Sequence, residues 1–474
     1  MTDTILIDAL TPECRIALLN NSRLTDIQIY RPDGGVRAGD VILGRVKAVV
    51  PSIRGAFIDL GDPRDGFLSF SDKAERSPVQ EGDALIVQVR HEAMVEKGAR
   101  LTTRISLPGR YAVYTPDRPG INVSRKGSDH DLADRIAGAV AAEVKPGDGA
   151  IVRTAALMLG ADGVSRAVTE LSALRDAWLD ARAVCAQVKP PHRLITAPDP
   201  VLQALQGLDA IRTRRIAVEG IDTFLLAKKY LEGSEPGLLD RLEQYQGAEG
   251  ILEVEGVEAE IDAALIPRVP LPSGGCLYIH ETPACVTADV DTDSASNGGG
   301  GKGRDIIRQT NGEAADALMR ALRLRNLSGN IVVDFIRDGD REVGRTLLDR
   351  LVSTSSDDPV PVEVAGFTRL GFVELTRRRR AASLSDILMD HSFGMPGTDK
   401  SPETLAYEAL RQLHHLAYGT PGRPITIRAH RDVIAMFRGK LTSALCDATL
   451  RAGVSVVLEI DEARPRSVAG IFNA

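Results

Sequence analysis

Residues 276–340 constrain the fold most, because they place carboxylates at the ends of otherwise apolar strands. The run ACVTADVD is a predicted strand ending in Asp289 and Asp291, and GNIVVDFI is an apolar strand with one carboxylate, Asp334. Residues 305–327 between them have the apolar spacing of a helix. A right-handed strand–helix–strand crossover makes its two strands parallel neighbours. The carboxylates should therefore lie together at the end of a sheet, where sites in α/β proteins form.

Asp334 inside VVDFI needs a partner, because burying an unpaired carboxylate is costly. A divalent metal is one such partner, and two carboxylates with waters suit Mg²⁺, which keeps much of its hydration. Such an ion can polarise a phosphodiester and lower the pKa of a bound water that attacks it. An ion pair with a nearby arginine is the alternative, and these residues alone leave both interpretations open.

The chain has 474 residues, which predicts about two to four domains. Residues 4–29 alternate like two short strands joined by a turn at residues 20–22. Several short strands with close turn signals follow over residues 39–90, and they favour an OB-fold barrel. On such a barrel, exposed aromatics such as Phe57 and Phe67 stack with bases, and a lysine meets phosphate. The alternative is that both phenylalanines belong to the core.

The net charge of −7 does not by itself suggest nucleic acid. Binding depends on the local field over a patch, however, and basic residues cluster in two places. One cluster is residues 377–380, and the other is Arg320, Arg323 and Arg325, near the candidate metal site. A solvated charged face is the alternative for either cluster taken alone.

The five cysteines are scattered and none has CxxC spacing, which favours a reducing compartment over a disulfide framework or a zinc ribbon. The first residues, MTDTILIDAL, lack a basic start followed by an apolar stretch, so no secretory signal is expected. The longest apolar runs are shorter than the roughly 20 residues that span a bilayer. A cytoplasmic protein without a membrane span is therefore expected.

A family resemblance rests on the stretches AVVPSIRGAFIDLGDPRDGFLSF, KGARLTTRISLPGRY, IVRTA, LPSGG, TADVD, TNGEAADALMRALRLRNLSGNIVVDFI and TRLGFVEL. Together they resemble the bacterial ribonuclease E/G family over almost the whole chain. Any one of them alone is unspecific, but their combination is highly specific.

The resemblance implies a multidomain α/β architecture. It places a discontinuous ribonuclease-H-like domain, an inserted OB-fold β-barrel for RNA, a 5′-end sensor region, a DNase-I-like α/β catalytic domain, a linker and a small α/β C-terminal domain. The corresponding ranges, in that order, are 1–35 with 200–262, 36–104, 105–199, 263–381, 382–401 and 402–474. The family's long disordered tail is missing, so in size the chain is similar to the short members.

The resemblance also implies roles for individual residues. The magnesium-binding catalytic aspartates correspond to Asp289 and Asp334. The RNA-gripping residues of the barrel correspond to Phe57, Phe67 and Lys97, which reverses the core interpretation of the two phenylalanines. The 5′-monophosphate pocket corresponds to Arg153 and Thr154, surrounded by Gly109, Val113 and Arg125. An arginine beside a hydroxyl suits a terminal phosphate, because its guanidinium donates two parallel hydrogen bonds. Arg323 and Arg325 of the second basic cluster are also expected to contact RNA.

The chain departs from the family pattern in four places, and one of them is the loop TDSASNGGGGKG after Asp291. The family has Asn two residues after its first catalytic Asp, where this chain has Asp291, and a third carboxylate could bind metal or raise a neighbour's pKa. A sensor arginine is replaced near Pro361, which weakens the prediction of 5′-end sensing. Residues 384–400 lack the cysteine pair of the family's zinc link, with only His391 as a candidate ligand. Zinc is therefore not predicted, and a homo-oligomer would form without a zinc bridge.

The expected function is that of a magnesium-dependent endoribonuclease acting on single-stranded, A/U-rich RNA, in ribosomal RNA processing and messenger RNA decay. It would leave 5′-phosphate and 3′-hydroxyl ends. The alternative is an RNA-binding protein of the same family with a weakened catalytic site, and the altered loop after Asp291 and the lost cysteine pair motivate it.

Overall fold

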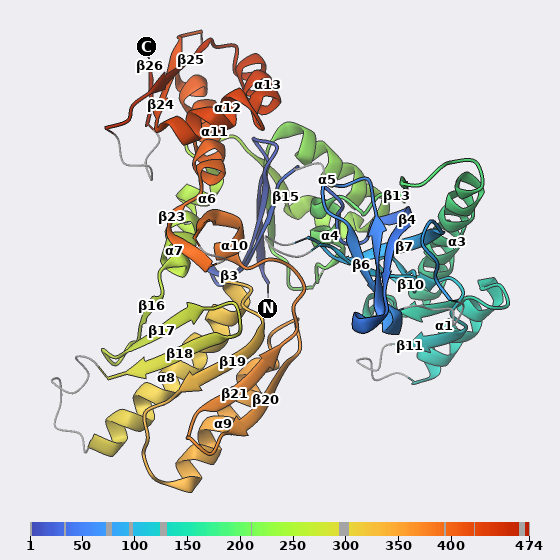
Figure 1. Ribbon diagram of the computed structural model, residues 1–474, viewed down its shortest axis with the longest axis horizontal. Helices are drawn as coiled ribbons and strands as arrows, with labels where there is room; N and C mark the ends of the chain where they lie inside the picture. The colour runs from blue at the N-terminus through green and yellow to red at the C-terminus, as the bar shows by residue number, and fades with distance from the viewer. Residues whose placement is uncertain are drawn as a thin grey trace. The chain divides into compact units, whose positions relative to one another are not determined.

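The computed structural model describes residues 2–32, 35–72, 78–93, 98–123, 130–209, 211–292, 303–392, 395–420, 422–463 and 470–473 (Figure 1). The chain folds as a mixed α/β protein with several sheets, in two compact units. One unit consists of Met1–Pro32 and Leu208–Ala474, and the other of Asp33–Gly207. The second unit is therefore inserted in sequence between two parts of the first.

The inserted unit contains a closed barrel of OB type, as the short strands predict. Its strands are ordered β4-β5-β6-β8-β7, and β7 closes the barrel on β4. Inward positions alternate along the strands and fill the interior with residues such as Val46, Ile58 and Leu68. The barrel strands are β4 (Val41–Val50), β5 (Gly55–Asp59), β6 (Gly66–Ser69), β7 (Ala84–His91) and β8 (Arg100–Thr102).

A second sheet of the inserted unit has the order β11-β12-β10-β9 and packs against helices α1 and α3. Trp178 of α3 and Tyr114 of β10 lie in their shared core. The elements of this part are β9 (Leu107–Pro108), β10 (Ala112–Thr115), β11 (Gly120–Val123), α1 (His130–Glu143), β12 (Gly149–Val152), α2 (Thr154–Met158), α3 (Ala161–Cys185), β13 (His192–Ile195), which pairs with β4, and α4 (Pro200–Gln206).

The first sheet of the other unit joins strands from both parts of that unit's sequence, in the order β15-β14-β1-β2-β3. Strands β1, β2 and β3 come from the part before the insertion, and β14 and β15 from the part after it. Residues 4–29 were predicted as two strands, but the structure has three, because the chain turns a second time over residues 9–13. The elements are β1 (Thr4–Asp8), β2 (Cys14–Asn20), β3 (Arg23–Tyr30), β14 (Arg215–Glu219), α5 (Ile221–Ser234), β15 (Leu242–Tyr245), α6 (Ile251–Val254) and α7 (Val257–Leu265).

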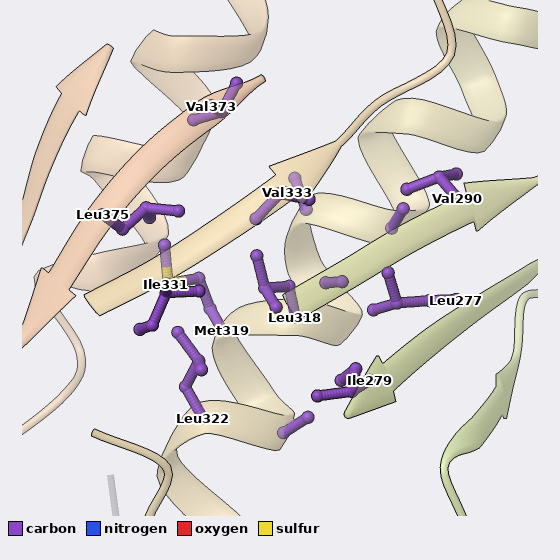
Figure 2. Close-up of a cluster of buried hydrophobic side chains, with 14 of the residues drawn as sticks. Leu277, Ile279, Val290, Leu318, Met319, Leu322, Ile331, Val333, Val373 and Leu375 are labelled. Atoms are coloured by element: carbon purple, nitrogen blue, oxygen red, sulfur yellow. The ribbon is translucent and has the colours of Figure 1, made fainter. Parts of the chain in front are cut away.

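The second sheet of this unit has the order β16-β17-β18-β19-β21-β20, and helices α8 and α9 cover one of its faces (Figure 1). Figure 2 shows Leu318 and Leu322 of α8 packed against Ile331 and Val333 of β19. The elements are β16 (Arg268–Pro270), β17 (Cys276–Glu281), β18 (Val286–Asp291), α8 (Gly303–Leu324), β19 (Gly329–Asp334), α9 (Arg341–Ser355), β20 (Val362–Phe367) and β21 (Val373–Arg377).

The remaining sequence forms a helix and hairpin, then a small α/β layer with strand order β25-β24-β26. Residues 382–401, expected as a linker, hold helix α10 and the paired strands β22 and β23. The elements are α10 (Leu384–Leu388), β22 (Met389–Ser392), β23 (Met395–Lys400), α11 (Pro402–Gly419), β24 (Ile425–Ala429), α12 (Arg431–Arg438), α13 (Thr442–Ala452), β25 (Val456–Ile460) and β26 (Gly470–Asn473). Across the ranges given above, no helix has both the length and the apolar character needed to cross a bilayer.

Candidate active site

Strands β18 and β19 run parallel, as the strand–helix–strand pattern predicts. Their register places Asp289 directly opposite Asp334, so the two carboxylates lie together at the carboxyl ends of β18 and β19. The long connection through α8 returns the chain to the neighbouring strand. The structure therefore brings together two carboxylates that are 45 positions apart in the sequence.

The two carboxylates lie on the face of the sheet that the helices leave uncovered. Along each strand, Ala288, Val290, Ile331 and Val333 are buried in the core under α8 and α9. Successive side chains point to opposite faces, so the aspartates between them point away from that core. Asp289 is exposed and Asp334 is half-buried. The prediction that Asp334 is fully buried is therefore wrong, because it lies at the strand end on the open face.

Neither Asp289 nor Asp334 forms an ion pair or a side-chain hydrogen bond with any residue that the structure describes. The arginines that the sequence analysis placed near the pair have other partners, and Arg377 lies opposite Gly329, at the other end of β19 from Asp334. Arg320 bonds to Glu260, and the guanidinium of Arg377 bonds to Asp358 at 2.8 Å. These contacts contradict the alternative in which an arginine neutralises the aspartate pair.

The two arginines expected to contact RNA have structural partners. Arg325 is only 7% exposed, and its guanidinium donates to the carbonyl oxygen of Ile266 at 2.8 Å. Burial lowers the pKa of Arg325 to about 10. Arg323 donates to the carbonyl oxygen of Asp357 at 3.2 Å. The burial of Arg325 argues against a direct contact with RNA, since a guanidinium that fills a core position is not offered to a ligand.

Helix α8 fixes the end of β19 through Asn311, a side chain to which the sequence patterns assign no separate role. The Asn311 amide donates to the carbonyl oxygen of Ile336 at 2.7 Å and accepts from its N–H at 3.0 Å. Ile336 lies two residues beyond Asp334. This clamp holds the strand end that carries the aspartate, and it gives a physical reason for the TNGE stretch quoted above.

The turn before β17 is fixed by the same helix. The Glu313 carboxylate accepts the backbone N–H of Ser273 at 2.8 Å. A Cβ atom on Gly275 would lie 2.7 Å from the carbonyl oxygen of Asp291 and 2.9 Å from Cγ2 of Thr310. Only glycine allows this approach without displacing backbone, so the LPSGG stretch positions the end of β18.

The donor set fits a hydrated divalent ion held by a carboxylate pair. Mg²⁺ is commonly bound through one or two carboxylates while it keeps several waters, and both aspartates are accessible and unneutralised. Within the described ranges, no three carboxylate, imidazole or thiol groups come together as a potential metal cluster. Asp291 shares the open face with Asp289 but lies beyond the stretch of β18 that pairs with β19, which ends at Asp289 opposite Asp334. This placement favours a two-carboxylate site over one with three carboxylates.

In the inserted unit, Phe57 and Phe67 form an outward pair on neighbouring barrel strands. They are register partners on β5 and β6, and their ring centroids lie 5.5 Å apart at 59°. Phe57 is 37% exposed, whereas the flanking Ala56 and Ile58 are buried. Both phenylalanines therefore lie outside the barrel interior, which contradicts the core alternative. Lys97 lies outside the residues that the structure describes.

The described residues expected at a 5′-phosphate pocket lie on or directly beside the inner strands β10 and β12 of the same unit. The Arg153 guanidinium donates to the carbonyl oxygen of Gly109 at 2.6 Å, and Thr154 begins α2 directly after it. Val113 of β10 lies opposite Ile151 of β12. Arg125 lies outside the described residues.

Glu170 of α3 fixes the loop beside these residues, and no sequence pattern indicated it. Its carboxylate accepts three consecutive backbone N–H groups, from Arg110, Tyr111 and Ala112, at 2.6 to 2.9 Å. This fixes the loop that carries Gly109.

Comparisons with known proteins agree with this geometry. The family model described as "Ribonuclease E/G family" matches residues 106–380. Ribonuclease G of Escherichia coli strain K12 is 30% identical over 97% of this chain and 97% of its own length. Ribonuclease G of Haemophilus influenzae is 31% identical over 86% of each chain. Ribonuclease E of Nostoc is 32% identical over 82% of this chain and 60% of its own length.

Proposed function

This chain belongs to the ribonuclease E/G family and is an endoribonuclease, and we propose that it hydrolyses single-stranded RNA with Mg²⁺ held by Asp289 and Asp334. The observation that carries this proposal is the register of β18 and β19, which sets the two aspartates opposite each other on an open face. The products would be a 5′-phosphate and a 3′-hydroxyl, and the substrates would include ribosomal RNA precursors and messenger RNA in the cytoplasm.

The protein's contribution to the chemistry is placement. The ion, when bound, supplies positive charge that polarises the phosphodiester and acidifies a water. Asp289 and Asp334 hold it at the strand ends, where Asn311 and Glu313 fix the backbone. The uncovered face of the sheet leaves room for the RNA strand to reach the aspartates.

Binding of the strand away from the metal is assigned to the barrel and to the pocket beside it. The outward pair of Phe57 and Phe67 offers stacking faces, which bind bases with little sequence preference. Lys97 and Arg323 would add contacts to phosphate. We assign a 5′-monophosphate to Arg153 and Thr154, with Gly109, Val113 and Arg125 around them.

The proposal extends to the family's domain architecture. Residues 1–35 with 200–262 would form the ribonuclease-H-like domain, which is supported by the sheet that joins β1, β2 and β3 to β14 and β15. Residues 263–381 would form the DNase-I-like domain, which contains the sheet from β16 to β21. Association into oligomers would use contacts other than a zinc bridge.

The test compares Asp289→Asn and Asp334→Asn with the wild type on a labelled, 5′-monophosphorylated single-stranded RNA, with and without Mg²⁺. Both variants should lose cleavage while binding the RNA with nearly unchanged affinity, because the amides keep the shape of the side chains. Cleavage at the wild-type rate by both variants would contradict the assignment. A wild type that binds RNA but does not cut it with Mg²⁺ would instead support the alternative of a weakened enzyme, which no observation here favours.

A further inference from the structure

A groove of about 730 Å³ lies at the carboxyl end of β19, in the same unit as the aspartate pair. Its lining comes from α8, from the loop after β19, from α9 and from the hairpin between β20 and β21, whose elements are labelled in Figure 1. The lining includes Phe335, the residue directly after Asp334. Phe335 is buried in the core under the helices, so the groove and the aspartates share the carboxyl end of β19 but lie on opposite faces of the sheet.

Arginines recur along this groove, and two of them are neutralised by carboxylates. Arg308 pairs with Asp338 at 2.8 Å, and Arg350 pairs with Asp316 at 2.9 Å. The arginines of the lining are Arg308, Arg337, Arg341, Arg345 and Arg350.

The other three arginines leave the groove with an excess of positive charge. Arg341 and Arg345 are exposed on α9, and neither has a hydrogen-bond or ion-pair partner in the part of the chain that the structure describes. The Arg337 guanidinium donates to the carbonyl oxygen of Leu370 at 2.6 Å, which leaves its charge uncompensated. Guanidinium groups match phosphate geometry, so an anionic ligand is indicated.

An aromatic ring lies beside these charges. Phe367, at the end of β20, lines the groove and is 45% exposed. A Cβ atom on Gly344 of α9 would lie 3.3 Å from its ring, so the ring rests against the helix backbone there. Cationic side chains that follow a backbone, together with an aromatic face for bases, are the two parts of a single-strand nucleic-acid site.

We propose that this groove is a further RNA subsite, in which Arg341 and Arg345 bind backbone phosphates of the strand on one side of the cleaved bond and Phe367 stacks with a base. The assignment rests on the proposed function, because a strand bound at Asp289 and Asp334 would pass around the carboxyl end of β19 to reach the groove. An acidic peptide would also satisfy the arginines, but the exposed ring and the position at the carboxyl end of β19 favour RNA.

The test measures RNA binding by fluorescence anisotropy in the Asp334→Asn background, with a labelled oligouridylate. The groove double variant, Arg341→Gln with Arg345→Gln, is compared with a control double, Arg214→Gln with Arg438→Gln. Both control arginines are exposed and have no side-chain partner among the described residues, so the same charge is removed elsewhere.

The groove double should bind about tenfold more weakly, and its slope of log K against log salt should shrink by about 1.4, the value for two single-strand phosphate contacts. The control double should change neither quantity. The loss should disappear for a short oligouridylate that reaches only the metal site. Equal binding by the two doubles would overturn the RNA subsite and leave an acidic peptide as the ligand for these arginines.

Phe367→Leu tests the stacking part, since leucine keeps apolar packing against Gly344. We expect about fivefold weaker binding of the long oligouridylate, with an unchanged melting temperature. Unchanged binding would overturn the role of Phe367. If Asp289→Asn and Asp334→Asn still cleaved RNA, the proposed function would be contradicted but the RNA subsite would not. The two failures are distinguishable because the anisotropy measurements record binding and require no catalysis.

Discussion

Two parallel strand pairs in this chain end in carboxylates that lie opposite each other, and the two pairs have opposite surroundings. Asp8 of β1 lies opposite Glu219 of β14, and Asp289 of β18 lies opposite Asp334 of β19. Asp8 and Glu219 are 1% and 4% exposed. Asp289 and Asp334 lie on an uncovered face without partners among the described residues.

The buried pair is surrounded by positive charge. The Arg15 guanidinium bonds to Asp8 at 2.6 Å, and Arg411 of α11 lies 3.7 Å from the same oxygen. Arg411 also bonds to Glu13 at 2.6 Å. Burial pushes the pKa of Asp8 upward, but the arginines outweigh it and hold that pKa below its usual value.

The comparison shows that register alone does not make a metal site. Both sheets set two carboxylates opposite each other, but the first pair has arginine partners and the second has none within the described ranges. A carboxylate that arginines saturate contributes to structure, whereas a bare accessible pair can bind an ion from solution.

The largest expected contrast is in activity. Asp334→Asn should lower the cleavage rate at least about a thousandfold, because a metal ligand is lost. Its melting temperature should stay within about 2 °C of the wild type, because the half-buried side chain has no partner to lose. Rates on labelled RNA and calorimetry measure the two quantities. A large fall in melting temperature with the rate retained would reverse the roles of the two pairs.

The buried pair should show the opposite behaviour. Asp8→Ala leaves Arg15 and Arg411 buried with one carboxylate fewer, so the free energy of unfolding should fall by about 3 to 4 kcal/mol. Urea unfolding measures this change. The matched control is Asp222→Ala, which breaks an exposed ion pair with Arg451 and should cost less than about 0.5 kcal/mol. Equal losses of unfolding free energy in the two variants would show that the buried interactions of Asp8 stabilise the fold no more than an exposed ion pair does.

Glu219 makes the contrast dependent on pH. Burial raises the pKa of Glu219 to about 7 from an ordinary value of 4.5. Between these values the folded state keeps a proton that the unfolded chain has released. The stability from this group is therefore complete below pH 4.5 and is lost as pH rises toward 7.

Glu219→Gln should remove this dependence. The free energy of unfolding of the wild type, minus that of the variant, is the quantity to follow. This difference should fall by about 2 kcal/mol from pH 4.5 to 7. His415 lies 3.6 Å away, and burial lowers its pKa, so it titrates in the opposite sense. Taking the difference cancels its contribution. A difference that is flat with pH would show that Glu219 stays ionised in the fold.

The smallest effect is expected at Asp291. Asp291→Asn restores the family's residue and should change the rate by less than about fivefold, since the geometry favours a site of two carboxylates. Cleavage rates across a magnesium titration measure it. A much larger loss would mean that Asp291 binds the ion, and the open site would then have three carboxylates.

Much of the fold followed from local patterns. The crossover between β18 and β19 was predicted from an apolar strand, a helical repeat and a second apolar strand, and the barrel from short strands with close turns. Residues 4–29 were predicted as two strands but form three, because the residues of the turn before Cys14 only weakly indicate a turn. Asn311 and Glu313 were quoted within a motif, but their bonds to Ile336 and Ser273 involve residues far away in sequence.

The sequence by itself determined that Asp289 and Asp334 lie at the ends of two apolar strands, because hydrophobic periodicity specifies each element locally. The family resemblance predicted that the aspartate pair binds a metal ion. Only the tertiary structure decided that Asp289 and Asp334 have no side-chain partner among the described residues, that Arg325 is buried and that Phe57 faces outward. Charge compensation depends on partners from distant segments, as with Glu13 and Arg411, which are 398 positions apart, and no local pattern specifies such a pairing.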